Sequence, residues 1–221
     1  MNSSQTQTRK LTSLAILSAV AYTLMMVGRV PVVLFLKYDP KDIVITFAGL
    51  IYGPLSSFIV SFVVSLVEFA TVSDTGPIGL IMNVVSTVSF ACVATVIYKR
   101  RQDRVGLTIG LVAGWLISTA VMMLWNYLIT PLYMNVSRDQ VAALLVPAFL
   151  PFNLLKGGLN ASFIMLLYNP LMNALRRARL IPEPDETAVT TSRRFGIGTA
   201  LASVLVITSC VLYILVKQKI I

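Results

Sequence analysis

Long runs without a charged residue constrain this chain more than any other feature of its sequence. A helix needs about 20 apolar residues to cross the hydrocarbon core of a bilayer. The chain is 57% hydrophobic and only 12% charged, far from the balance of a soluble domain. We therefore expect an all-α integral membrane protein. The uncharged runs, with Lys156 as the one internal charge, are Leu11 to Gly28, Ile43 to Val67, Thr75 to Tyr98, Val105 to Ser137, Gln140 to Leu175 and Phe195 to Val216.

The second run needs a division, because Ile43 to Ser73 is interrupted only by Glu68 and is too long for one straight crossing. It contains Tyr52-Gly53-Pro54, in which proline favours a break and glycine allows a reversal. We expect two helices there, over about 42–51 and 54–71, and the first is too short to span fully. The prediction is seven helices, arranged as a membrane domain over 1–180, a polar cytoplasmic linker over 181–194 and an additional hydrophobic helix over 195–221.

The basic residues indicate the orientation of the chain, because cytoplasmic loops near membrane segments are enriched in Lys and Arg. A cytoplasmic N-terminus places most of them inside: Arg9, Lys10, Lys99, Arg100, Arg101, Arg104, Arg176, Arg177, Arg179, Arg193 and Arg194. Fewer fall outside, chiefly Arg29, Lys37, Lys41 and Arg138. We therefore predict a cytoplasmic N-terminus.

Several function classes are disfavoured by what the sequence contains. The net charge of +9 comes from basic residues that lie where the membrane topology favours them. No nucleic-acid-binding motif accompanies these residues. Cys92 and Cys210 lie in separate apolar runs without metal-type spacing, and the chain has no histidine. It also has no GxxxxGK[ST] phosphate-binding loop and no paired carboxylates on an evident face. We expect no enzyme activity, no metal, no cofactor and no nucleic-acid partner.

Polar residues inside the membrane segments raise the functional question, because an ionisable group there is costly unless it is paired or hydrated. With the topology above and a rise of about 1.5 Å per residue, Glu68, Asn83, Asn126, Asn153 and Lys156 lie at similar depth on the outer side of four helices. Convergent polar groups in an apolar setting are typical of a ligand site. We therefore predict that these five residues line a ligand pocket open to the outside.

The face around Lys156 sharpens this prediction. Asn153, Lys156 and Asn160 are three and seven residues apart, so they share one face of the helix, while Leu154 and Leu155 can face elsewhere. Alternatives remain for each residue. Lys156 can extend to the outer headgroups, the asparagines can form hydrogen bonds between packed helices, and Glu68 can be an interfacial carboxylate.

The outer segment from Gly28 to Asp42 is a second candidate. It is apolar, ends in aromatic and charged residues, and contains Pro31 and Pro40, which limit helix. Such a segment is suited to cover a pocket as a lid. The alternative is an interfacial loop with Lys37, Tyr38 and Asp39 among the headgroups.

Several stretches resemble the S components of energy-coupling factor (ECF) vitamin transporters, and riboflavin-binding members in particular. They are LKYDPKDIVITFAGLIYGP, DTGPIGLIMNVVSTVSFACVATVIYKRRQ, WNYLITPLY and FNLLKGGLNASFIMLLY. The resemblance covers about Leu11 to Leu180. It implies a six-helix substrate-binding subunit of a prokaryotic cell membrane, which delivers riboflavin through a coupling subunit and two ATPase subunits.

The same resemblance implies roles for individual residues. Asn126, Asn153 and Lys156 match flavin-contacting positions, and Leu36, Lys37 and Tyr38 fall in the lid loop. The match is weaker for Asn83 and Glu68. Ala15 and Ala19 are similar to the small-residue motif that packs on the coupling subunit, since alanines four apart permit close helix approach. The hydrophobic segment from Phe195 to Val216 departs from the family pattern and would be a seventh helix.

The chemistry suits riboflavin. Its ring system is flat and uncharged and has an imide edge on which hydrogen-bond acceptors alternate with a donor. Carboxamides such as those of Asn126 and Asn153 can form hydrogen bonds with this edge, since each carries both a donor and an acceptor. A folate or pantothenate site would want several cations, and the predicted pocket offers one, Lys156. An S component for another vitamin, an ion-coupled secondary carrier using Glu68 and Lys156, and a membrane assembly subunit without a ligand remain open.

Overall fold

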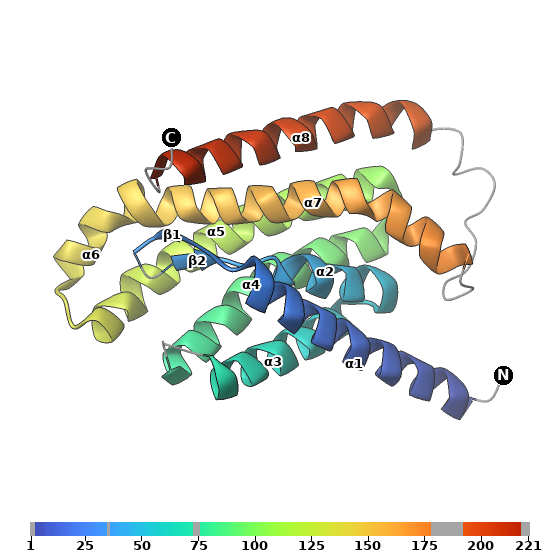
Figure 1. Cartoon of the computed structure of the whole chain (residues 1–221), viewed down its shortest axis with the longest axis horizontal. Coiled ribbons are helices and arrows are strands. Elements are labelled where there is room, and N and C mark those ends of the chain that lie inside the picture. Colours follow the sequence, from blue (N-terminus) through green and yellow to red (C-terminus); the bar gives the residue numbers. More distant parts are fainter. Residues whose placement is uncertain (1–2, 35, 73–75, 178–191, 218–221) are drawn as a thin grey trace.

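The computed structural model of the chain describes residues 3–34, 36–72, 76–177 and 192–217. It is a bundle of long helices with a short β-hairpin among them (Figure 1). Within these described ranges, five helical stretches are long and apolar enough to cross a membrane: residues 7–28, 54–71, 76–100, 104–132 and 138–175. The prediction of a helical integral membrane protein is confirmed.

The predicted division of the second run is correct. Helix α1, Ser3–Gly28, leads through the hairpin to the short helix α2, Lys41–Tyr52, and helix α3, Pro54–Thr71, follows after one residue. Gly53 joins α2 and α3 with a φ of +94°, a conformation that residues with a Cβ rarely adopt. Pro54 occupies the first turn of α3, where its missing N–H costs no helical hydrogen bond. The chain therefore reverses at Gly53.

Helices α4, Gly76–Arg100, and α5, Arg104–Met134, pack closely against each other. The reason is a row of glycines on α5. A Cβ built on Gly110 would lie 2.5 Å from the carbonyl oxygen of Ala94, and one on Gly114 would lie 2.6 Å from that of Phe90. Small residues let membrane helices approach at the backbone, so these glycines set the spacing between α4 and α5.

The sixth predicted helix is a continuous helical stretch of three parts. Helix α6, Arg138–Leu144, passes into a π-helical turn η1, Leu145–Phe149, and then into helix α7, Leu150–Arg177. Ser137 and Gln140 form a reciprocal capping box at its start. Pro147 and Pro151 cannot donate backbone hydrogen bonds, which accounts for the irregular turn. This turn immediately precedes the segment that carries Asn153 and Lys156.

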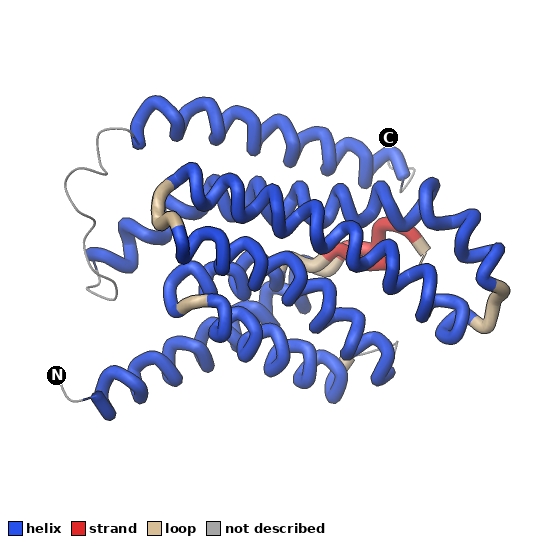
Figure 2. The backbone as a smooth tube through the Cα atoms, turned by 180° about the vertical axis from the view of Figure 1, so that it is seen from behind, coloured by secondary structure: helices blue, strands red, loops and turns tan. Residues whose placement is uncertain are grey.

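The segment between α1 and α2 is a β-hairpin, whereas the sequence predicted an all-helical fold with a lid loop. Strands β1, Val30–Val33, and β2, Leu36–Tyr38, are antiparallel, with Val30 opposite Tyr38. Figure 2 shows the hairpin lying among the helices toward one end of the molecule. Val32, Leu36 and Tyr38 are buried with apolar residues of η1 and α7, such as Phe149 and Phe152. Tertiary packing thus stabilises two strands too short to persist alone.

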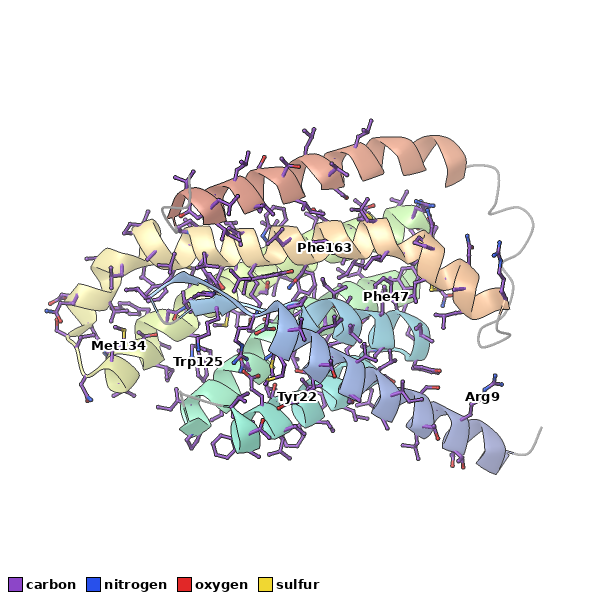
Figure 3. The ribbon with its side chains drawn as sticks, viewed as in Figure 1. Arg9, Tyr22, Phe47, Trp125, Met134 and Phe163 are labelled. Atoms are coloured by element: carbon purple, nitrogen blue, oxygen red, sulfur yellow. The ribbon has the colours of Figure 1, made fainter. Side chains whose placement is uncertain are left out.

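The apolar interior consists of two clusters. The first joins α1, α2, α3, α4, α5 and α7, and it includes Phe47 of α2. The second joins the hairpin to α6, η1, α7 and α8. Phe163 of α7, labelled in Figure 3, packs against both. Lys41 and Asp42, at the beginning of α2, are buried charged residues that belong to neither cluster.

The predicted additional helix is present as α8, Ser192–Lys217, which lies alongside α7 on the side of the molecule away from α1 (Figure 1). Most of the predicted linker lies outside the described residues. The N-terminal end of α1, the end of α7 and the start of α8 lie at one end of the molecule, and the hairpin and α6 lie toward the other. A six-helix body with one additional C-terminal helix is therefore confirmed.

Candidate functional site: a buried charged network

A network of charged side chains is centred on the beginning of α2. The chain enters this helix from β2 through Asp39 and Pro40, and Lys41 and Asp42 form its first turn. Residues 41 to 50 are all buried, so α2 has no solvent-facing side on which to place its charges. Lys41 is 0% exposed. Burying a charged side chain is strongly unfavourable unless it is paired and hydrogen-bonded. The partners come from the residues next to the hairpin and from α3, α4 and α7.

One half of the network surrounds Glu68 of α3. Its carboxylate accepts hydrogen bonds from Arg29, from Lys41 Nζ at 2.5 Å and from Asn83 Nδ2 at 3.0 Å. Asp39 Oδ2 lies 3.7 Å from Lys41 Nζ and 3.9 Å from the Arg29 guanidinium. These contacts join the end of α1, the beginning of α2, α3 and α4. Glu68 and Asn83 therefore lie together, with Glu68 buried and Asn83 half-buried.

The other half surrounds Asp42. Lys156 Nζ of α7 lies 3.1 Å from Asp42 Oδ2, and Asn160 Nδ2 donates to the same oxygen at 3.2 Å. Thr87 of α4 donates to Asp42 Oδ1 at 2.6 Å. Ser86, the preceding residue, accepts from Lys156 Nζ at 3.2 Å. Lys156 therefore points to internal partners, with a side chain 12% exposed, and does not extend to the headgroups.

The hairpin closes this half of the network through Tyr38. Its hydroxyl donates to Asn160 Oδ1 at 3.3 Å. Burial raises the pKa of the Tyr38 phenol, and the Asp42 and Asp39 carboxylates raise it further, so the hydroxyl keeps its proton. Along β2, Leu36 and Tyr38 face inward and Lys37 faces outward. The structure brings Tyr38 into the site, places Leu36 in the apolar cluster beside it and leaves Lys37 at the surface.

Asn126 and Asn153 are buried, but their observed hydrogen bonds are local. Asn126 Nδ2 donates to the Met122 carbonyl at 2.7 Å, and its Oδ1 accepts from Thr130 at 3.0 Å. Asn153 Nδ2 donates to the Phe149 carbonyl at 2.8 Å, next to the π-helical turn. These bonds fix both carboxamides in place. Each amide nitrogen has a second N–H, which these bonds leave for another acceptor.

The network carries equal numbers of positive and negative side chains, which corrects the prediction of a single cation. Among the described residues, the network contains three cations and three carboxylates: Arg29, Lys41 and Lys156, with Asp39, Asp42 and Glu68. Sequence reasoning assigned four of these residues to an outer loop and a helix start. The available signal was the cluster of charges in KYDPKDI, directly before a helix too apolar to have a polar face.

This chain matches the family model of the ECF transporter substrate-specific component over residues 9–168. The chain belongs to this family of S components. It is 28% identical to the riboflavin transporter RibU of Staphylococcus aureus over 77% of this chain and 94% of that protein. It is 31% identical to RibU of Streptococcus thermophilus over 77% of this chain and 86% of that protein. It is 28% identical to the riboflavin transporter FmnP of Bacillus subtilis over 67% of this chain and 84% of that protein.

Its fold is likewise that of an S component. A solved structure of the S component of a bacterial ECF transporter superposes with a TM-score of 0.65 at 28% identity, and the match covers 76% of this chain and 98% of the other. The relatives are bacterial transporters, and the S component described here is a multi-pass membrane protein. The family match ends at residue 168, so α8 lies beyond it.

The small-residue pair of this S component lies on the outside of the bundle. Ala15 and Ala19 are exposed on α1, while Leu14 on the same helix is buried in the core. Helix α8 packs mainly on α7 and β1, and α1 packs on α2 and α3. Figure 1 places α1 and α8 on different sides of the molecule. The additional helix therefore does not cover Ala15 and Ala19.

Proposed function

We propose that this chain is the riboflavin-binding subunit of an ECF-type vitamin importer. The observation that carries the proposal is that three relatives, each matched over most of its length, are riboflavin transporters. The charge balance of the buried network supports it independently. A ligand without net charge can enter such a network without leaving a cation or a carboxylate unpaired, whereas a folate or pantothenate carboxylate would need a surplus cation.

The proposed binding residues are those predicted from the sequence: Asn126, Asn153, Lys156, Asn83, Leu36, Lys37, Tyr38 and Glu68. The ammonium of Lys156 and the second amide N–H groups of Asn126 and Asn153 are donors suited to the carbonyl oxygens and ring nitrogens of a flavin. Asp39 Oδ1 is a buried acceptor without a hydrogen-bond partner among the described residues. A ribityl hydroxyl would satisfy it. Lys37 faces outward, so a contact between Lys37 and the ligand would require the hairpin to move.

Energy for transport would come from partners. An S component without a phosphate-binding loop would associate with a coupling membrane subunit and two ATPase subunits, and would not itself be an enzyme. Ala15 and Ala19 are exposed and free of α8, as a docking face for the coupling subunit requires. With the N-terminus cytoplasmic, the hairpin lies toward the outer end of the molecule and would admit riboflavin from outside.

Purification of the full chain in detergent tests this proposal. We expect a yellow, flavin-fluorescent preparation, because a tightly held vitamin survives purification. After removal of the flavin, titration should show saturable quenching of riboflavin fluorescence, with thiamine, folate and pantothenate failing to compete. A colourless protein with no saturable riboflavin binding would refute the proposal. Riboflavin uptake that collapses with a proton uncoupler and needs no partner subunits would favour a secondary carrier instead.

A further inference from the structure

Asp42 is buried and is held by side chains from two helices, α4 and α7. It is 1% exposed, and its two oxygens accept from Thr87 Oγ1 at 2.6 Å and Asn160 Nδ2 at 3.2 Å in addition to the ion pair with Lys156. Thr87 and Asn160 are themselves buried and lie on α4 and α7. The carboxylate is therefore fixed from two helices, and it cannot turn away from Lys156 without losing these hydrogen bonds.

A fixed Asp42 carboxylate also determines the orientation of the Lys156 ammonium. An ammonium has three N–H groups, and two are directed to Asp42 Oδ2 at 3.1 Å and Ser86 Oγ at 3.2 Å. The third has no partner among the described residues. A lysine side chain is a flexible stem that ends in three rotatable donors. A fixed carboxylate on one side and a hydroxyl on the other hold the ammonium in place and direct the remaining N–H.

We infer that Asp42 is a positioning residue for ligand binding. It acts through Lys156, holding the ammonium in place and presenting its third N–H to an acceptor of the ligand, and Thr87 and Ser86 on α4 orient the pair. The inference deepens the proposed function and rests on it. Asp42 itself does not need to contact the ligand in this arrangement.

A double-mutant cycle tests this coupling. The variants are Asp42→Asn, Lys156→Met and the two combined, and the measurement is the riboflavin dissociation constant in detergent. We expect each single variant to weaken binding about tenfold or more. The combined variant should bind like Lys156→Met alone, because without the ammonium Asp42 has nothing to position. Asp103→Asn, in the loop between α4 and α5, is the matched control and should bind as the unaltered protein does.

Two outcomes would overturn the inference. One is an Asp42→Asn protein with unchanged affinity, and the other is a combined variant whose losses add. If Lys156→Met itself leaves the affinity unchanged, the proposed site fails rather than the coupling alone. Should Asp42→Asn not fold, Thr87→Val removes one support of the carboxylate and keeps every charge. It should weaken binding severalfold in the presence of Lys156 and not in the Lys156→Met background.

Helix α8, which lies beyond the family match, packs against the hairpin. Ile214 of α8 is buried in the same apolar cluster as Val32 and Leu36 of the hairpin, and Ile207 and Tyr213 pack against that cluster. The hairpin in turn carries Tyr38, whose hydroxyl reaches Asn160 in the network. A two-stranded hairpin is marginal by itself, so its packed position depends on the apolar contacts that cover it.

We propose that α8 is a brace that holds the hairpin in its packed position. Amide hydrogen exchange of residues 30–38 tests this without any ligand. Ile214→Ala, and Ile207→Ala with Ile214→Ala, should raise the exchange of these amides severalfold, and riboflavin release should become faster by a similar factor. Leu212→Ala, at an exposed position of the same helix, should change neither. Unchanged exchange of the hairpin in both Ile214 variants would overturn the proposal, whatever the ligand proves to be.

Discussion

Lys41 and Glu68 form an ion pair of 2.5 Å between Nζ and Oε2 in the interior of the molecule, where Lys41 is 0% exposed. Removing one partner of a buried pair leaves the other charge uncompensated, which costs about 3–5 kcal/mol. Glu68→Gln should therefore lower the melting temperature in detergent strongly. The combined Glu68→Gln and Lys41→Met variant should recover part of the loss, since it removes the stranded charge. A melting temperature unaffected by Glu68→Gln would show that this pair is not stabilising.

Lys156→Met should weaken riboflavin binding roughly tenfold to a hundredfold, because an acceptor of the ligand loses its donor in a largely dry site at a cost of about 1–3 kcal/mol. Fluorescence titration measures the change. Leu154→Met is the matched control, since Leu154 is exposed on α7. Leu155 is unsuitable: the sequence suggested that it faces away from the site, but it is buried in the cluster that holds the hairpin. Equal affinities for the Lys156 and Leu154 variants would contradict the assignment.

Gly157→Ala should destabilise the protein, whereas Gly158→Ala should have little effect. A Cβ on Gly157 would lie 2.1 Å from Trp115 Cδ1 of α5, and one on Gly158 would have its nearest neighbour at 3.4 Å. Displacing a packed indole ring costs about 1–3 kcal/mol. Thermal melting of the two variants, which differ by one position on one helix, makes the comparison direct. Equal melting temperatures would mean that Trp115 can move aside freely.

Ala15→Trp combined with Ala19→Trp should abolish riboflavin uptake by cells and leave binding by the purified chain intact. Both positions are exposed on α1, so bulky rings there meet no internal neighbour but would obstruct a helix of the coupling subunit. Uptake assays and fluorescence titration separate the two effects. Loss of both would show that this face supports the fold itself.

Much of the fold was predictable because hydrophobic length and helix-breaking residues act locally. The reversal at Gly53, the separate short α2 and the additional α8 all follow from apolar runs and their interruptions. The shared face of Lys156 and Asn160 followed from helix periodicity alone. The hairpin was not predictable by these means, since its strands are short and depend on burial against α7.

The sequence by itself determined that the chain is a helical membrane protein and which polar residues lie within its membrane segments. Only the tertiary structure decided what those residues meet. Arg29, Asp39, Lys41 and Asp42 read as residues of an outer loop and helix start, yet the fold turns them inward against Glu68 and Lys156. The physical reason is that a buried charge is tolerable only beside its partner, and the pairing of residues distant in sequence depends on how the helices pack.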